Sequence, residues 1–345
     1  MWGPDFTEWT NVKAARALYR DHRQPYTPHL GFYDLSVPQN LQRIIDKARS
    51  NHIEGFVYWH YWLNKSTRPL AKVPEIHQSL ATNQKFAFAW ANANWTRSWV
   101  GDDSVLAEQT YDLDEVDTHL DYLIRFFEDE RYLRIDGAPV LQVNSLLHSE
   151  VLTYIHDLDQ RYARRFGRGI HWLFQWPHAA SRAHSIAPLT YSVISYPPST
   201  VLKQAPSATR LKRAGQLWLS RKTPIRAGPF RMSANRYIAW FQKEQAKLCK
   251  AYGNHVVPVA LSGWDNTPRY GHGGQVIDGD SSELLRRQLE IIDANWANRD
   301  LCLIKSWNEW AEGNVLEPLK DRFGTFHDSA ATVESYVSST KSARS

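Results

Sequence analysis

The stretch "KFAFAWAN", residues 85–92, decides the fold, because it is an apolar run of strand length. Six further runs of this kind follow or precede it: "IEGFVYWHYW" from Ile53, "APVLQV" from Ala138, "GIHWLFQW" from Gly169, "TYSVISYP" from Thr190, "HVVPVALSGW" from His255 and "LCLIKSWNEW" from Leu301. Most of them are nearly continuous apolar segments, which is typical of parallel strands covered on both faces.

Helical patterns separate most of these runs. "DLDEVDTHLDYLIRFFED" from Asp112 and "DSSELLRRQLEIIDANW" from Asp280 each begin with the acidic pair of a capping box, namely Asp112/Glu115 and Asp280/Glu283. Their apolar residues share one helix face: Val116, Leu120, Ile124 and Phe127 in the first, and Leu285, Leu289, Ile292 and Trp296 in the second. Strands that alternate with helices predict an α/β fold with a parallel sheet.

The length suits a (β/α)8 TIM-type barrel, which needs one strand more than these seven runs supply. The segment "PQNLQRIIDKARS" from Pro38 is interpreted as turn-rich and without a strand. We therefore expect a barrel that lacks its first strand at the N-terminus. No domain boundary or repeat is visible, so residues 1–345 are expected to form a single domain.

Composition excludes several classes of protein. With 43% apolar and 22% charged residues the chain can bury a sizeable core, and no apolar run approaches the ~18 residues of a membrane span. The start "MWGPDFTEWT" has no signal-peptide pattern, which favours the cytoplasm if Met1 is the true start. A net charge of +5 does not point to nucleic acid. No Gly-rich phosphate loop, nucleophilic serine elbow or metal-ligand spacing is present, so no metal site is predicted.

The aromatic content indicates a ligand. Fifteen Trp and sixteen Tyr are many, and several lie next to Asn, Asp or Glu instead of inside apolar runs. Indole faces stack on the C–H faces of sugars, while neighbouring amides and carboxylates bond the hydroxyls. A carbohydrate site is therefore favoured over ordinary core and surface aromatics.

Polar and aromatic residues cluster where the predicted strands end, which in a barrel is the functional face. Five such clusters are expected to converge on one mouth and to bind substrate: Tyr58, Trp59, His60 and Tyr61; Trp90, Asn92, Asn94, Trp95 and Arg97; Tyr196; Trp264, Asp265, Asn266 and Arg269; and Trp307, Asn308 and Trp310. Four tryptophans are expected to form a platform for the sugar: Trp59, Trp95, Trp264 and Trp310.

The last cluster contains a candidate catalytic pair, Glu309 and Glu312, within "KSWNEWAEGNVLEP", residues 305–318. Glycosidic bond cleavage uses two carboxyl groups, and burial beside indoles would raise the pKa of one so that it stays protonated. The alternative is structural: Glu309 bonds backbone in a turn and Glu312 is exposed.

A basic insertion covers residues 199–233, where no acidic residue occurs. It carries Lys203, Arg210, Lys212, Arg213, Arg221, Lys222, Arg226 and Arg231. It is either a solvated basic face or a loop that contacts a phosphate, a uronic acid or a lipid-linked diphosphate.

Several motifs in order carry a resemblance to a known family: "FTEWTNV", "GFYDLS", "YWHYWLN", "WANANWTRSWVG", "RYLRIDGAPV", "WDNTPR" and "SWNEWAEGNVLEP". Together they resemble the WbsX-type glycosyltransferase family of polysaccharide (O-antigen or capsule-type) biosynthesis. That family is similar to glycoside hydrolase family 99, the endo-α-mannosidases, which have a (β/α)8 barrel.

The resemblance implies roles for the pair. Glu309 would draw the proton from the sugar 2-hydroxyl, which attacks the anomeric carbon, and Glu312 would be general acid and then base. Configuration would be retained with no cofactor. Two departures are visible: relatives usually have a strand before "FTEW", and Ala93 stands where they usually have glutamate.

Three hypotheses remain open. The first is an enzyme that cleaves or transfers a glycosyl unit of a glycan or polysaccharide substrate, anionic or lipid-linked, with no nucleic acid and no membrane span. The second is a glycosyltransferase that uses a nucleotide-sugar or lipid-linked donor. The third is an inactive glycan-binding barrel.

Overall fold

In the computed structural model the described residues are 6–96, 104–195, 211, 214–215, 228–296 and 301–344. The chain divides into two compact units. One unit comprises Met1–Tyr33, Arg97–Asp103 and Tyr196–Ser345, and the other comprises Asp34–Thr96 and Ser104–Ser195. We call them unit 1 and unit 2, and each is described by itself.

Unit 2 contains a parallel sheet built from five of the predicted strands, in the order β2–β3–β7–β8–β9. The bounds are β2 Gly55–His60, β3 Lys85–Trp90, β7 Ala138–Val143, β8 His171–Gln175 and β9 Tyr191–Ile194. Two short antiparallel pairings accompany it, β6 (Arg134–Ile135) on β7 and β4 (Trp95–Thr96) with β5 (Val105–Ala107). Along β3, every residue from Phe86 to Trp90 is buried, as expected of a strand covered on both faces.

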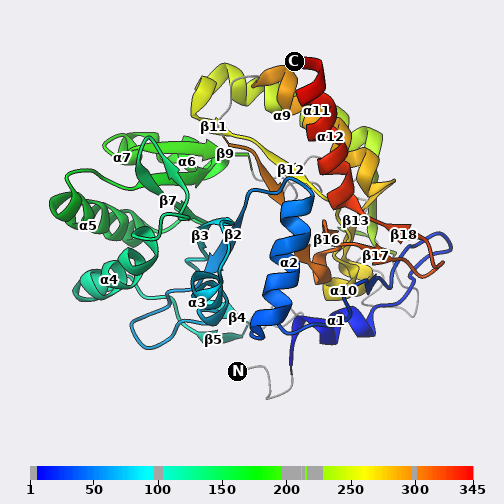
Figure 1. Ribbon diagram of the computed structural model, residues 1–345, viewed down its shortest axis with the longest axis horizontal. Helices are drawn as coiled ribbons and strands as arrows, with labels where there is room; N and C mark the ends of the chain where they lie inside the picture. The colour runs from blue at the N-terminus through cyan, green and yellow to red at the C-terminus, as the bar shows by residue number, and fades with distance from the viewer. Residues whose placement is uncertain are drawn as a thin grey trace. The chain divides into compact units, whose positions relative to one another are not determined.

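The helices of unit 2 are α2 Pro38–Ser50, α3 Lys72–Ser79, α4 Val116–Phe127, α5 Ser149–Phe166, α6 Trp176–Ser181 and α7 Ala183–Ile186. In Figure 1, α4 and α5 lie side by side, in agreement with their contacts. The segment from Pro38 was expected to be turn-rich, which is wrong, because it forms helix α2. Pro38 lies in the first turn of this helix, where proline is well tolerated, and the helix buries an apolar stripe.

The first predicted helix is preceded by a 3-10 turn, η2 (Leu113–Glu115). Asp112 caps this turn by accepting from the Asp114 N–H at 3.0 Å, while the Glu115 carboxylate accepts from the Lys65 N–H at 2.8 Å. The predicted capping box of α4 is therefore wrong in its second member. For the predicted helix that begins after Asp280, the first member of the capping box is confirmed, since the Asp280 side chain accepts from the Glu283 N–H.

Unit 1 carries parallel pairs β12–β14 and β10–β13, the hairpin β15–β16, and the antiparallel order β1–β17–β18. The strands are β1 Thr27–Pro28, β10 Phe230–Ser233, β11 Val256–Val257, β12 Val259–Leu261, β13 Gln275–Asp278, β14 Leu303–Lys305, β15 Asn308–Glu309, β16 Asn314–Val315, β17 Leu319–Lys320 and β18 Phe326–His327. The helices are α1 Glu8–Ala14, α9 Ala234–Tyr252, α10 Thr267–Tyr270, α11 Ser281–Asn295 and α12 Ser329–Arg344, with 3-10 turns η3 Gly253–His255, η4 Gly271–Gly273 and η5 Trp310–Glu312.

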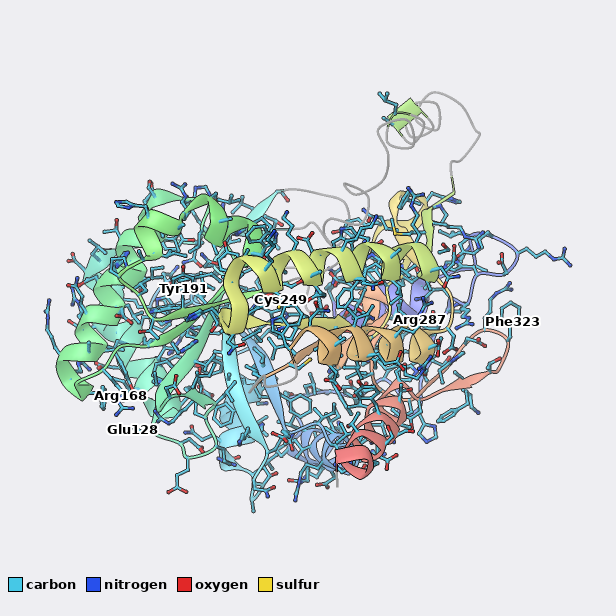
Figure 2. The ribbon with its side chains drawn as sticks, turned by 90° about the horizontal axis from the view of Figure 1, so that it is seen from above. Glu128, Arg168, Tyr191, Cys249, Arg287 and Phe323 are labelled. Carbon is cyan, nitrogen blue, oxygen red and sulfur yellow. The ribbon has the colours of Figure 1, made fainter. Side chains whose placement is uncertain are left out.

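Two long helices pack against each other in unit 1. Figure 2 shows α9, which carries Cys249, running beside α11, which carries Arg287. The Arg287 guanidinium donates to the Asn235 side chain at 2.6 Å, and Gln288 of α11 bonds the backbone of Leu261 in β12. Helix α11 therefore contacts strand β12, and the four residues of its predicted apolar face are buried: Leu285, Leu289, Ile292 and Trp296.

The last two predicted strands are shorter than expected. Proline 258 separates β11 from β12, since it has no N–H for a strand ladder. The final run leaves its parallel partner at Lys305 and then forms the hairpin β15–β16. The α/β class with a parallel sheet is thus confirmed, while the eight-stranded barrel, its missing first strand and the single domain stay predictions.

Candidate active site

The two glutamates of the predicted pair lie on consecutive short elements of unit 1. Glu309 ends strand β15, and Glu312 ends the 3-10 turn η5. The chain then turns at Gly313, whose φ of +55° is in the left-handed region. A Cβ at that position would lie 2.8 Å from both the Cβ and the carbonyl oxygen of Asp265. The backbone is held to the same neighbour, because the Asp265 N–H donates to the Glu312 carbonyl at 2.8 Å.

Two cations hold both carboxylate oxygens of Glu312. Arg269 Nη1 of α10 lies 2.7 Å from Glu312 Oε1, and Lys305 Nζ of β14 lies 2.7 Å from Glu312 Oε2. The second guanidinium nitrogen of Arg269, Nη2, is 3.8 Å from Glu309 Oε2. This distance suits an ion pair but is too long for a hydrogen bond. The two glutamate side chains retain 16% and 21% exposure, for Glu312 and Glu309 respectively. A single guanidinium therefore contacts two carboxylates that still reach the surface.

These contacts set the protonation of Glu312. Burial alone would raise its pKa, but Lys305 and Arg269 together outweigh burial and hold the pKa of Glu312 below its ordinary value. Burial alone would lower the pKa of Arg269, but the carboxylates of Glu312 and Glu309 raise it above its ordinary value. Glu312 is therefore not the member of the pair that burial keeps protonated, because its lowered pKa favours the ionised form.

A third carboxyl group, Glu8 in the first turn of α1, was not among the predicted site residues. Its Oε1 accepts from the Ala311 N–H at 2.8 Å, inside the turn that ends at Glu312. Burial first, and the charge of Glu309 second, raise the pKa of Glu8 to about 8. In the sequence Glu8 has the position of an ordinary first-turn helix acid. The only signal that could have singled it out is the motif "FTEW", where it neighbours Trp9 as Glu309 neighbours Trp310.

Two tryptophans of the motif, Trp307 and Trp310, donate hydrogen bonds to the buried carboxyl group of Glu317. Trp307 Nε1 donates to Glu317 Oε1 at 2.7 Å, and Trp310 Nε1 donates to Glu317 Oε2 at 3.1 Å. The hydroxyl of Tyr33 donates to the same Oε2 at 2.7 Å. Burial raises the pKa of Glu317 to about 7 despite these three donors. The aromatic cluster thus anchors the segment that follows the glutamates.

Trp310 cannot serve as the predicted sugar platform in this arrangement. It is 1% exposed and lies in an apolar cluster with Val12, Ala311, Val315 and Leu319. Trp264 is also buried, and Lys305 Nζ lies 5.4 Å from the centre of its ring. Asn308 is half-buried, and its amide donates to the Tyr33 hydroxyl at 3.2 Å.

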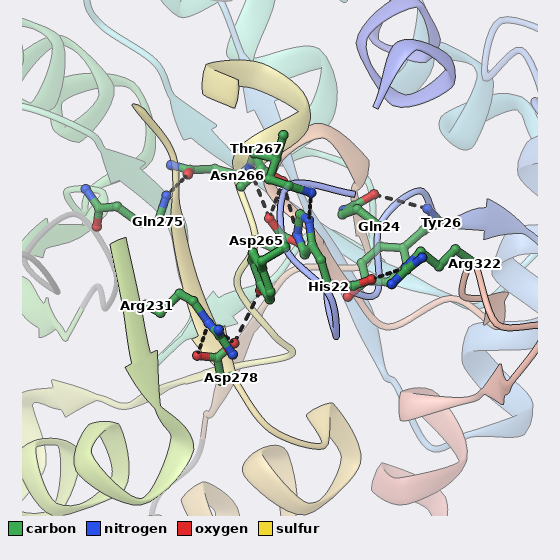
Figure 3. A network of polar contacts seen from close by, with 12 residues as sticks. His22, Gln24, Tyr26, Arg231, Asp265, Asn266, Thr267, Gln275, Asp278 and Arg322 are labelled. Carbon is green, nitrogen blue, oxygen red and sulfur yellow. Dashed lines mark hydrogen bonds and ion pairs between the residues drawn. The ribbon is translucent and has the colours of Figure 1, made fainter. Parts of the chain in front are cut away.

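The polar residues before α10 are also engaged within the protein. Figure 3 shows Asp265 between His22 and Thr267. The Leu18 N–H donates to His22 Nδ1, so His22 Nε2 is the protonated nitrogen and donates to Asp265 Oδ2 at 2.8 Å. Thr267 Oγ1 donates to Asp265 Oδ1 at 2.6 Å, and Asn266 Oδ1 accepts from the Gln275 N–H at 2.6 Å. Both predicted binding residues are buried and position α10, which carries Arg269.

The predicted residues of unit 2 fall into two groups. His60, Trp90 and Asn92 are buried with partners: His60 Nε2 lies 2.9 Å from His119 Nε2, Trp90 Nε1 bonds the Trp62 carbonyl, and Asn92 bonds the backbone of Ser145. Tyr58 is half-buried, with its hydroxyl 2.8 Å from His77 Nδ1. Trp59, Tyr61 and Trp95 are half-buried like Tyr58, and Asn94 is exposed, as is Ala93.

Some predictions fall outside the described residues: Arg97, Tyr196, Lys203, Arg210, Lys212, Arg213, Arg221, Lys222 and Arg226. Arg231 of the basic insertion is described. It pairs with Asp278 at 2.9 Å and Asp21 at 3.2 Å, and its guanidinium carbon lies 4.0 Å from the ring centre of Tyr19. Its charge is thus already matched by carboxylates. The convergence of five clusters on one mouth stays a prediction.

None of the helices in the described part of the chain is both long and apolar enough to cross a membrane. Within the same residues, no group of three or more His, Cys, Asp and Glu side chains could hold a metal ion.

Comparisons of sequence identify relatives. The model of the family described as "Glycosyltransferase WbsX" matches residues 1–327. Two proteins named "Uncharacterized protein WxcX", from two strains of Xanthomonas campestris pv. campestris, are 27% identical over 329 residues. The match covers 92% of this chain but 44% of each relative, so the chain spans less than half the length of these curated relatives.

Comparisons of structure agree on the fold. A glycoside hydrolase-like protein matches with a TM-score of 0.63 and 11% identity, covering 90% of this chain and 89% of its own. The endo-alpha-mannosidase of glycoside hydrolase family 99 from Bacteroides thetaiotaomicron matches with a TM-score of 0.56 and 14% identity, covering 94% of this chain and 86% of its own. At such identities the likeness shows the fold alone, an α/β fold with a parallel sheet.

Proposed function

Because the chain belongs to the glycosyltransferase WbsX family, we propose that it is a carbohydrate-active enzyme that cleaves or transfers a glycosyl unit of a polysaccharide. The likeness in fold to glycoside hydrolases supports the same class of reaction. We assign the chemistry to Glu309 and Glu312. The observation that carries the assignment is the Arg269 guanidinium, which contacts Glu312 at 2.7 Å and Glu309 at 3.8 Å and so holds two surface-reaching carboxylates together.

The proposed reaction has two steps. In the first, Glu309 takes the proton of the sugar 2-hydroxyl, the freed oxygen bonds the anomeric carbon, and the leaving oxygen takes a proton from Glu312. In the second, the oxygen of an acceptor hydroxyl bonds the anomeric carbon and gives its proton to Glu312, while the bond between the anomeric carbon and the 2-oxygen breaks and the 2-oxygen regains its proton from Glu309. Configuration is retained, because the anomeric carbon is inverted twice.

The ionised state of Glu312 suits the second step directly. A carboxylate with a lowered pKa is ready to accept the proton of an incoming hydroxyl. For the first step Glu312 must carry a proton, which requires that substrate binding withdraw Lys305 or Arg269 from one of its oxygens. The substrate is therefore expected to compete for one of these two cations.

Proton NMR of the producer's surface polysaccharide tests the proposal. Wild type, Glu312→Gln and the control Glu283→Gln would be incubated with it, first alone and then with nucleotide sugars. Glu283 is an exposed residue of α11 that pairs with Arg286, so its variant should match wild type. New reducing-end anomeric signals without donor, absent in Glu312→Gln, support hydrolysis or transglycosylation.

The second candidate is a glycosyltransferase with an activated donor, which the family description favours. Signals that require an added nucleotide sugar support it. Equal signals from wild type and Glu312→Gln contradict the assignment of Glu312. Binding of the polysaccharide by a folded protein without any turnover supports the third alternative, an inactive glycan-binding barrel. The motivation for that alternative is Ala93, which stands where the resembling family usually has glutamate.

A further inference from the structure

The carboxyl group of Glu8 belongs to the same small region as the proposed pair. Helix α1 packs on both η5 and α10, the elements that carry Glu312 and Arg269. Glu8 Oε1 accepts from the Ala311 N–H at 2.8 Å, and Ala311 lies between Glu309 and Glu312 in the chain. The side chain of Glu8 therefore bonds the backbone that sets the separation of the two glutamates.

Among the described residues, the cation that acts on the Glu8 carboxyl is Arg269, and this arginine also pairs with Glu312 and Glu309. The groups that act on its carboxyl are Glu309, Glu312 and Arg269. Lys305 is a second cation of the cluster, but its ammonium group lies 2.7 Å from Glu312. Two cations thus face two carboxylates, and a third negative charge in a half-buried position would be unmatched.

We propose that Glu8 is a positioning residue of the site, whose neutral carboxyl group holds the turn between Glu309 and Glu312 and leaves Arg269 and Lys305 to those two carboxylates. This inference rests on the proposed function for its effect on turnover. The raised pKa of Glu8, about 8, is consistent with a neutral carboxyl group at pH 7. When Glu8 ionises, it attracts Arg269 and repels Glu309, so the pair loses its arrangement at alkaline pH.

Carbon-13 NMR tests the inference without any substrate. The protein labelled at the glutamate carboxyl carbons would be titrated from pH 5 to 10. We expect one resonance to titrate near pH 8, to be absent in Glu8→Gln and to persist in Glu283→Gln. The chemical shift of the Glu309 carboxyl carbon should change over the same pH range in wild type and should not do so in Glu8→Gln. A Glu8 resonance that titrates near 4.5, or no response of Glu309, overturns the inference.

The pH dependence of kcat/KM tests the effect on the proposed reaction. In wild type it should fall about tenfold per pH unit above 8. In Glu8→Gln, which keeps an oxygen for the Ala311 N–H, the fall should vanish. In Glu8→Ala, kcat/KM should drop about 10- to 100-fold at every pH, because the turn loses its anchor.

The two tests separate the inference from the proposed function. A wild type without turnover, whose Glu8 nevertheless titrates near 8 and perturbs Glu309, contradicts the proposed function and leaves the positioning role standing. An alkaline fall that persists in Glu8→Gln overturns the role of Glu8 even when the enzyme is active. If Glu8→Ala does not fold, the Glu8→Gln profile decides.

Discussion

Arg269 is the residue on which the candidate site depends most. Its side chain is 8% exposed and is the shared partner of Glu312 and Glu309. Arg269→Gln leaves two half-buried carboxylates short of a cation, so we expect the free energy of unfolding to fall by about 3 kcal/mol. The pKa of Glu312 should rise in the same variant, since Lys305 alone remains. Urea unfolding measures the first effect, and carbon-13 NMR measures the second.

A surface arginine provides the matched control for this variant. Arg286 of α11 also pairs with two carboxylates, those of Glu283 and Glu290, but its side chain is 45% exposed. Arg286→Gln is expected to change the free energy of unfolding by less than about 1 kcal/mol. Equal losses in the two variants would contradict the special position of Arg269.

Glu317 makes the stability of the protein depend on pH. Burial raises its pKa from the ordinary 4.5 to about 7, so the folded state keeps a proton that the unfolded chain has lost. The free energy of unfolding should therefore fall as pH rises from about 4.5 to about 7, by up to about 3 kcal/mol from this group. Glu317→Gln should remove that part of the slope in urea unfolding measured at several pH values. The control is Glu283→Gln, which should keep the wild-type slope over the same range, because the hydrogen bond from Arg286 lowers the pKa of the Glu283 carboxyl group.

At the scale of elements, the turn η5 and Gly313 bring the pair to α10. Gly313→Ala adds a Cβ at φ +55° that would lie 2.8 Å from Asp265, so both backbone strain and a clash oppose it. We expect a loss of about 3 kcal/mol in urea unfolding and a loss of turnover. Gly167→Ala is the control, because Gly167 has φ +73° and open space around it. It should lose about 1 kcal/mol, from the left-handed backbone alone. A similar loss in the two variants would show that the contact with Asp265 does not matter.

The sequence predicted elements well where one force dominates. Strands β3 and β7 of unit 2 are almost entirely buried, as their nearly continuous apolar runs predict. It failed where local chemistry competes: Pro258 divides one predicted strand, and the last run leaves the sheet at Lys305 to form β15–β16. Glu309 and Glu312 are consequently on a hairpin and a 3-10 turn, although they follow a parallel strand as predicted.

At the scale of the whole molecule, unit 2 has a core of its own. Its buried side chains include Phe86, Phe88, Leu141 and Trp172, on neighbouring strands of one sheet. We expect the fragment of residues 34–195 to fold alone, with near-ultraviolet circular dichroism and a cooperative urea transition. Leu141→Asp in that fragment should abolish both, since the site is fully buried. A fragment without a cooperative transition would contradict the independence of unit 2.

The candidate site was harder to predict than the fold, because aromatic and amide side chains serve packing as well as binding. Trp310 and Asp265 were expected to touch substrate, yet their polar atoms bond Glu317, His22 and Thr267 inside unit 1. Glu8 was missed for the opposite reason. It lies 303 residues from Ala311 in the chain, and no local pattern encodes a contact of that range.

That separation of 303 residues also sets when the site can exist during synthesis. At about 5–20 residues per second, a ribosome needs roughly 15–60 s to extend the chain from Glu8 to Ala311. Throughout that time α1 has no partner turn, while the strands of unit 2, made in between, are already complete. The contact between Glu8 and the turn of the two glutamates can therefore form only after Ala311 has left the ribosome.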